Sequence, residues 1–207
     1  MKVDLKYILS IYTLLIIQIA ITISIIYYLK YKNIPIENFS KNYKYLFLLL
    51  LSLPVILMLS LNIPKVLKLM LLTCLSIIFG VMIYPSTINV DNNLLLNVLL
   101  MTVGIFVGLS ILTFYMVSKG YDLSGMRNYL FAALIGLIVV GLILLFYRNS
   151  RLYATYLVIG AVIFSLYIMY DTNNIIKKRL DVINSTVSFY LDFINLFLYI
   201  FQMYNPK

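Results

Sequence analysis

Two aspartates lie inside apolar runs of the sequence, where a carboxylate is costly to keep. The chain has seven acidic residues, and the others lie in polar loops or near the start of the chain. Asp192 lies near the middle of the run FYLDFINLFLYIF, and Asp171 lies late in the run SLYIMYDTNNIIKKR. Inserting an aspartate at the centre of a membrane helix costs ~2.5–3.5 kcal/mol. A chain that keeps one there usually directs it into a cavity or towards a partner.

The two carboxyls are predicted to act as a pair. If consecutive helices run antiparallel, the end of the helix that carries Asp171 meets the first half of the helix that carries Asp192. Two neighbouring carboxylates in a medium of low dielectric cannot both ionise cheaply, so they share a proton and titrate together. Loss of that proton would create repulsion and expose oxygen ligands suited to a hard cation. The simpler alternatives are a polar residue near a helix end for Asp171 and a neutral structural acid for Asp192.

A polar stripe runs along the last apolar segment. Its members recur at spacings of three and four, which places them on one helix face: Ser185, Ser188, Asp192, Asn195, Tyr199 and Gln202. Tyr167, Asp171 and Asn174 share a face of the preceding segment. A polar stripe in a membrane helix must face protein or water. The stripe alone fits hydrogen bonding between helices as well as it fits an ion pathway. The central aspartate favours a pathway, with the last helix lining it.

These side chains need a membrane protein to position them. The chain has 207 residues, of which 63% are hydrophobic and 11% are charged, whereas a soluble domain carries about 25% charged residues. Continuous apolar runs of roughly 20 residues predict spanning helices and not barrel strands. We expect one multi-pass membrane domain over residues 1–207, an all-α bundle of seven transmembrane helices. The predicted spans are residues 8–29, 45–63, 66–84, 94–117, 128–147, 152–177 and 183–204.

The rest of the composition argues against several classes of function. The net charge is +9, but the basic residues flank apolar runs, which predicts a lipid-bilayer partner and not nucleic acid. With no histidine and one cysteine, we expect no disulfide within the chain and no zinc site. No Walker loop, GxSxG or HExxH motif occurs, so we expect neither an enzyme nor a cofactor.

Weaker polar and small-residue signals predict packing between helices. Gly104 and Gly108 form a GxxxG pattern, which is typical of close helix contact. Scattered polar residues inside the other spans are expected to bond between helices and not to bind ligands: Gln18, Thr73, Ser76, Asn97 and Thr102.

Two C-terminal segments carry a resemblance to a known family. FYLDFINLFLYIFQ at 189–202 resembles the signature LYLDxINLFLxxL, and FSLYIMYDTNNI at 164–175 resembles FSxYIxYDTxxI. Both are signatures of the transmembrane Bax inhibitor motif family, which includes Bax inhibitors, lifeguard and Golgi anti-apoptotic proteins and bacterial relatives. Residues 118–139 and 11–22 are similar to other parts of the family, so the resemblance covers most of the chain.

The resemblance implies six helices around a central C-terminal seventh and a pH-sensitive calcium leak. Asp171 and Asp192 match the family's paired aspartates, described as the latch of that leak, so they are candidates for transient contact with Ca²⁺ as the permeant ion. It also implies suppression of cell death, apoptosis-regulating or other membrane proteins as partners, and an endoplasmic reticulum or Golgi membrane, or a plasma membrane in a bacterium. Many relatives carry an acidic residue near the position of Ser76, so a calcium role does not extend to that helix. The alternative is a non-conducting anti-apoptotic scaffold that acts through protein partners.

Overall fold

The computed structural model describes residues 4–34, 51–57, 59, 63–147, 149–178 and 180–205. Its main elements are α1 (Leu5–Tyr31), α3 (Lys65–Thr87), α4 (Asn92–Ser118), the short 3₁₀ helix η1 (Ser124–Met126), α5 (Arg127–Phe146), α6 (Ser150–Lys178) and α7 (Val182–Tyr204). The described residues contain no strand, and residues 51–57 are also helical. Most of the span predicted at 45–63 lies outside the described residues.

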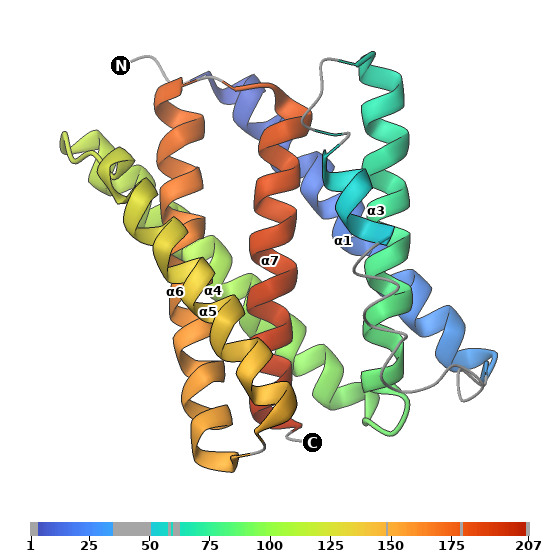
Figure 1. The fold of residues 1–207 in the computed structure, drawn as a ribbon. Helices are drawn as coiled ribbons and strands as arrows, with labels where there is room; N and C mark the ends of the chain where they lie inside the picture. Colours follow the sequence, from blue (N-terminus) through green and yellow to red (C-terminus); the bar gives the residue numbers. More distant parts are fainter. Residues whose placement is uncertain are drawn as a thin grey trace. The chain divides into compact units, whose positions relative to one another are not determined.

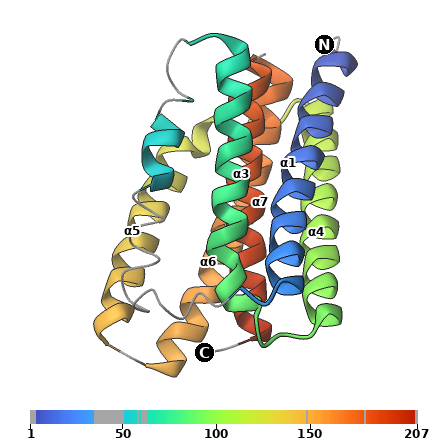
Figure 2. The same cartoon turned by 90° about the vertical axis from the view of Figure 1, so that its right-hand side faces the viewer.

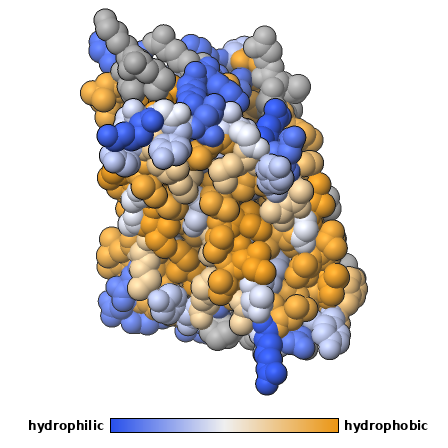
Figure 3. Space-filling view, turned by 90° about the vertical axis from the view of Figure 1, so that its left-hand side faces the viewer, coloured by the Kyte–Doolittle hydropathy of each residue, from blue (hydrophilic) through white to orange (hydrophobic). Residues whose placement is uncertain are grey.

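The fold class predicted from the sequence is confirmed. Six of the described helices are long and apolar enough to cross a membrane, and their bounds agree with the predicted spans to within three residues. Figure 3 shows hydrophobic side chains over the middle of the helices on the visible face and hydrophilic ones at their ends. This pattern is that of helices that bury their middles in lipid.

Short polar side chains set where two of these helices begin. The Tyr7 N–H donates to Asp4 Oδ1 at 3.2 Å at the start of α1. Asn149 Oδ1 accepts from the N–H groups of Arg151 and Leu152, both at 3.0 Å, at the start of α6. The first N–H groups of a helix have no partner within it, so Asp and Asn are favoured at these positions.

The end of α3 differs from the expectation that Pro85 closes the third span. The helix continues through Pro85 to Thr87. A proline removes the hydrogen bond that its N–H would donate, but in the last turn this is a single bond. The Thr87 hydroxyl donates to the Tyr84 carbonyl at 2.8 Å and stabilises that turn.

The chain divides into two compact units, each described here by itself. Unit 1 holds residues 1–91 and 181–190, and unit 2 holds residues 92–180 and 191–207. In unit 1, α1 packs against α3 (Figure 2). In unit 2, α6 packs against α4 and α5. The single membrane domain expected over residues 1–207 stays a prediction.

Helix α7, drawn in red in Figure 1, contributes its first nine residues to unit 1 and the rest to unit 2. It is also the most buried candidate span, with 61% of its apolar window buried against 11–39% for the others. The polar residues of α7 are therefore placed mainly among protein atoms. The arrangement of six helices around it stays a prediction.

The close helix contact expected at Gly104 and Gly108 is wrong for the described part of the chain. A Cβ placed at either glycine would meet no described atom within 4 Å. The buried face of α4 carries Phe106 and Ser110 instead, and the two glycines lie on the exposed face. Close approaches occur elsewhere. In unit 1, a Cβ at Gly80 would lie 2.8 Å from Ile25 Cβ.

Candidate functional site

The structure brings Asp171 and Asp192 together within unit 2. Asp171 lies seven residues, about two turns, before the end of α6, and Asp192 lies near the middle of α7. The two side chains lie within hydrogen-bonding reach and interact electrostatically. The predicted antiparallel meeting of the two helices thus places both carboxyls at one point. Their role as a latch stays a prediction.

The two carboxyls differ in burial and in their partners. Asp192 is only 5% exposed, and its Oδ2 has no hydrogen-bond partner among the described residues. Asp171 is half-buried. A buried carboxylate without a full set of partners is costly when ionised. A proton shared with Asp171 is the cheapest way to keep Asp192 in this position.

The α6 residues predicted to share a face with Asp171 lie close to the pair. Tyr167, one turn before Asp171, lies within electrostatic range of both carboxyls. Asn174, almost one turn after it, is buried, and in the described part of the chain its Oδ1 has no hydrogen-bond partner. The surroundings of the pair therefore hold a second open acceptor oxygen.

The polar stripe of α7 does not have one environment along its length. Ser188 is exposed, although its stripe neighbours Ser185 and Asp192 are buried. Asn195 is half-buried and donates from Nδ2 to the Leu191 carbonyl of its own helix at 2.8 Å. Tyr199 and Gln202 bond to tyrosines of α6. The members of the stripe thus have separate functions in packing.

A buried group of neutral polar residues in unit 1 is the part of the molecule that the sequence did not single out as a unit. We call Gln18, Thr22, Ser76 and Tyr190 the hydroxyl cluster; all are 2% exposed or less. The Thr22 hydroxyl lies 2.6 Å from the Tyr190 hydroxyl and donates to the Ser76 carbonyl at 3.1 Å. Ser76 Oγ donates to Gln18 Oε1 at 2.7 Å. The cluster joins α1, α3 and the first half of α7.

The expectation that scattered polar residues bond between helices holds for some of them. Gln18 and Ser76 do so, as described above. Thr73 and Thr102 instead donate to the carbonyls of Leu69 and Val98 in their own helices. A threonine hydroxyl easily reaches the carbonyl one turn earlier, so spacing alone does not identify a partner on another helix.

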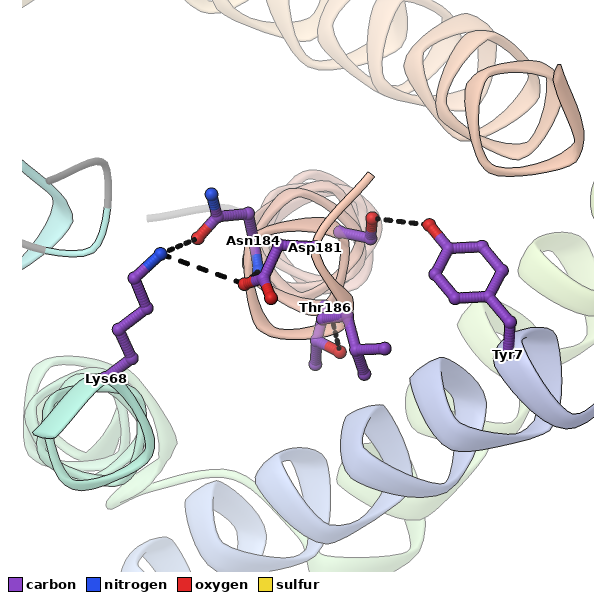
Figure 4. A network of polar contacts seen from close by, with 7 residues as sticks. Tyr7, Lys68, Asp181, Asn184 and Thr186 are labelled. Carbon is purple, nitrogen blue, oxygen red and sulfur yellow. Dashed lines mark hydrogen bonds and ion pairs between the residues drawn. The ribbon is translucent and has the colours of Figure 1, made fainter. Parts of the chain in front are cut away.

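A lysine contacts the beginning of α7 in unit 1 (Figure 4). Lys68, in the first turn of α3, is 8% exposed. Its Nζ donates to Asn184 Oδ1 at 3.2 Å and lies 3.8 Å from Asp181 Oδ2. The Tyr7 and Ser185 hydroxyls, 3.3 Å apart, connect α1 to the same turn. The only sequence signal for this contact is a lysine one turn inside an apolar run.

In unit 2, the α4–α5 connection is fixed to the last two turns of α6. Asp122 Oδ1 accepts from the Ser124 N–H at 2.9 Å and from Asn173 Nδ2 at 3.4 Å, and Asp122 Oδ2 lies 3.1 Å from Lys177 Nζ. The Leu123 N–H donates to Asn173 Oδ1 at 3.3 Å. The Ser124 N–H, and then Lys177, hold the pKa of Asp122 well below its usual range. This connection begins two residues after Asp171.

Fold and site together define a multi-pass helical membrane protein with a paired intramembrane carboxyl. The chain belongs to the family described as inhibitor of apoptosis-promoting Bax1, whose sequence model matches residues 5–207. The family predicted from the C-terminal motifs is thereby confirmed.

Several known proteins are similar to the chain. Protein LIFEGUARD 4 of Arabidopsis thaliana is 39% identical over 111 residues, which is 52% of this chain and 45% of that protein. A BI1-like protein of the same plant is 32% identical over 139 residues, 66% of this chain and 54% of that protein. An uncharacterized membrane protein of Vibrio cholerae is 37% identical over 94 residues, 45% of this chain and 41% of that protein. The chain thus matches about half the length of these curated relatives.

Proposed function

We propose that the protein is a pH-sensitive calcium leak of the Bax inhibitor type, with Asp171 and Asp192 as its latch. One observation carries the proposal. The buried Asp192 carboxyl lies beside a second carboxyl, and among the described residues its Oδ2 has no partner. A purely structural polar group is normally satisfied, because an unpaired buried acceptor lowers stability. A group that exchanges a proton and meets a cation needs an acceptor that packing leaves open.

The chemistry of the pair supports a protonation-controlled latch. In the closed state the two carboxyls share one proton, which links α6 to α7. When that proton is lost, two like charges lie side by side in a medium of low dielectric, and their repulsion separates the helices. The separated carboxylates then offer the anionic oxygen ligands that Ca²⁺ prefers. Calcium leak therefore rises with pH as the pair loses its proton.

The biological role follows from the family. Its description names inhibition of apoptosis-promoting Bax1, and relatives carry the name LIFEGUARD. A controlled leak sets the calcium content of a membrane compartment and thereby suppresses cell death. We place the protein in an endoplasmic reticulum or Golgi membrane, or in the plasma membrane if its host is a bacterium. Apoptosis-regulating or other membrane proteins are its proposed partners.

Calcium flux from liposomes tests the latch. The full chain is reconstituted, and Ca²⁺ flux is measured across a pH series for the parent and for the double variant Asp171→Asn, Asp192→Asn. We expect the double variant to lose the pH dependence, because amides neither share nor release the proton. Asp91→Asn, an exposed acid between α3 and α4, is the matched control and should behave as the parent does. An unchanged pH profile in the double variant contradicts the latch.

The same experiment separates a leak from a scaffold. A scaffold predicts little flux from the purified protein at any pH. It also predicts that protection against cell death survives both Asp→Asn changes, because the carboxyls would then be structural.

A further inference from the structure

An aromatic cluster lies between α6 and the C-terminal half of α7, inside unit 2. The ring of Tyr199 has its centroid 5.5 Å from that of Tyr156 and 5.8 Å from that of Phe164. The Tyr199 hydroxyl donates to the Tyr156 hydroxyl at 3.0 Å. Beside them, the Tyr153 hydroxyl donates to Gln202 Oε1 at 2.6 Å. We call these five residues the aromatic cluster.

Gly160 gives the ring of Tyr199 its place on α6. A Cβ at position 160 would overlap the Cε1 and Cζ atoms of that ring. The ring therefore lies directly against the α6 backbone, and the two helices approach closely at this point. Tyr199 is held on three sides, by the backbone at Gly160 and by the rings of Tyr156 and Phe164.

The position of Tyr199 on the polar stripe connects it to the carboxylate pair. It follows Asp192 by seven residues, which is two turns or ~10 Å along the helix axis. Asn195 lies between them on the same face. A cation that leaves Asp192 along this face towards the C-terminal end of α7 meets the ring of Tyr199. Packed protein interiors leave few voids larger than a water molecule, so the ring has to move before an ion passes.

We infer that Tyr199 is a second barrier on the cation route, separate from the proton shared by the carboxyls. This inference rests on the proposed leak. The carboxylate pair controls the separation of α6 and α7 at Asp171, whereas Tyr199 closes the route towards the C-terminal end. The contacts that hold Tyr199 are a bond between hydroxyls, two ring contacts and the place at Gly160. Since none of these is a carboxylate contact, the barrier does not depend on the protonation of the pair.

Ca²⁺ flux from liposomes holding the full chain tests the barrier. We expect Tyr199→Ala to raise the flux about tenfold at every pH, equivalent to a barrier ~1.4 kcal/mol lower, with the pH dependence retained. Tyr204→Ala, at an exposed position of the same helix, should leave the flux unchanged. Gly160→Ala keeps the tyrosine but displaces its ring, and should raise the flux by a smaller factor. Gly136→Ala is its control, because a Cβ there meets no described atom within 4 Å.

Labelling of a cysteine gives a readout that does not depend on flux. Cys74 is the single cysteine of the chain, so Cys74→Ser provides a background in which Asn195→Cys is the only thiol. We expect a charged, water-soluble thiosulfonate to modify this thiol faster when Tyr199→Ala is also present. If the parent leaks and Tyr199→Ala changes neither flux nor labelling, the barrier is wrong and the proposed leak stands. If neither the parent nor Tyr199→Ala leaks at any pH, both ideas are wrong.

Discussion

The two halves of α7 carry polar residues of similar spacing in two different chemical settings. The first half ends at Tyr190 in the hydroxyl cluster of unit 1, which is neutral and linked by short hydrogen bonds. The second half begins beside Asp192 in unit 2, where a carboxyl meets a carboxyl and, in the described structure, one acceptor oxygen has no partner. The residues are two positions apart in the chain.

This difference decides how a polar stripe in a membrane helix should be interpreted. Hydrogen bonds between membrane helices contribute about 0.6 kcal/mol each on average, and the hydroxyl cluster has the complete bonding of a packing contact. The carboxylate pair has incomplete bonding and two ionisable groups, which favours function over packing. Four variants test this contrast.

The largest expected loss of stability follows from Gly80→Ala in unit 1. The new Cβ would lie 2.8 Å from Ile25 Cβ and 3.0 Å from the Thr22 carbonyl oxygen, and the backbone atom cannot rotate away. Overpacking of this kind costs ~1–3 kcal/mol, so the thermal midpoint in detergent should fall. Gly104→Ala is the control, since its Cβ meets no described atom. If the variant that remains folded also lost the pH dependence of flux, the two settings would not be separable.

Tyr190→Phe should lower the free energy of unfolding by about 1 kcal/mol, because it removes one buried hydrogen bond. The bond lost is the 2.6 Å contact with Thr22. The pH profile of calcium flux should stay as in the parent. Asp192→Asn should show the reverse, with an altered pH profile and little loss of stability. Tyr204→Phe, on the exposed part of α7, controls for loss of a hydroxyl.

Asp122→Asn should loosen the α4–α5 connection without changing the rest of unit 2. Because the folded state lowers the pKa of Asp122, its stabilising effect is present above the ordinary aspartate pKa of about 3.9 and is lost as the pH falls below it. Hydrogen exchange at the Leu123 and Ser124 amides should therefore be faster in the variant near neutral pH, and the difference should shrink in acid. A difference that grew in acid would contradict the assignment. Asp91→Asn serves as the control.

The smallest effect is expected from Lys68→Met, which keeps the apolar stem and removes the charge. The Asp181 side chain is 35% exposed and still accepts from the Asn184 N–H at 3.3 Å. Such pairs contribute about 0–1 kcal/mol, so the unfolding free energy should fall by less than about 1 kcal/mol. Lys65→Met, at an exposed position of the same turn, is the control. A larger loss would show that the start of α7 depends on this charge.

Much of the carboxylate pair was predictable, and the hydroxyl cluster was not. Asp171 and Asp192 lie on consecutive segments joined by a short loop, so antiparallel packing brings similar depths together. Gln18 and Ser76 are 58 positions apart, and Thr22 and Tyr190 are 168 apart. Nothing local in the sequence distinguishes these residues from Thr73, which bonds within its own helix.

The sequence by itself determined the spanning helices, the family and the two acids that lie among apolar residues, because hydropathy and period are local properties of a segment. Tertiary structure alone decided that Ser188 is exposed, that Tyr199 lies on Gly160 and that Asp192 Oδ2 has no partner among the described residues. Each residue along a helix turns the facing side by about 100°. The partners of a polar side chain therefore depend on the rotation and axial shift of each helix against its neighbours, which are set only when the helices pack.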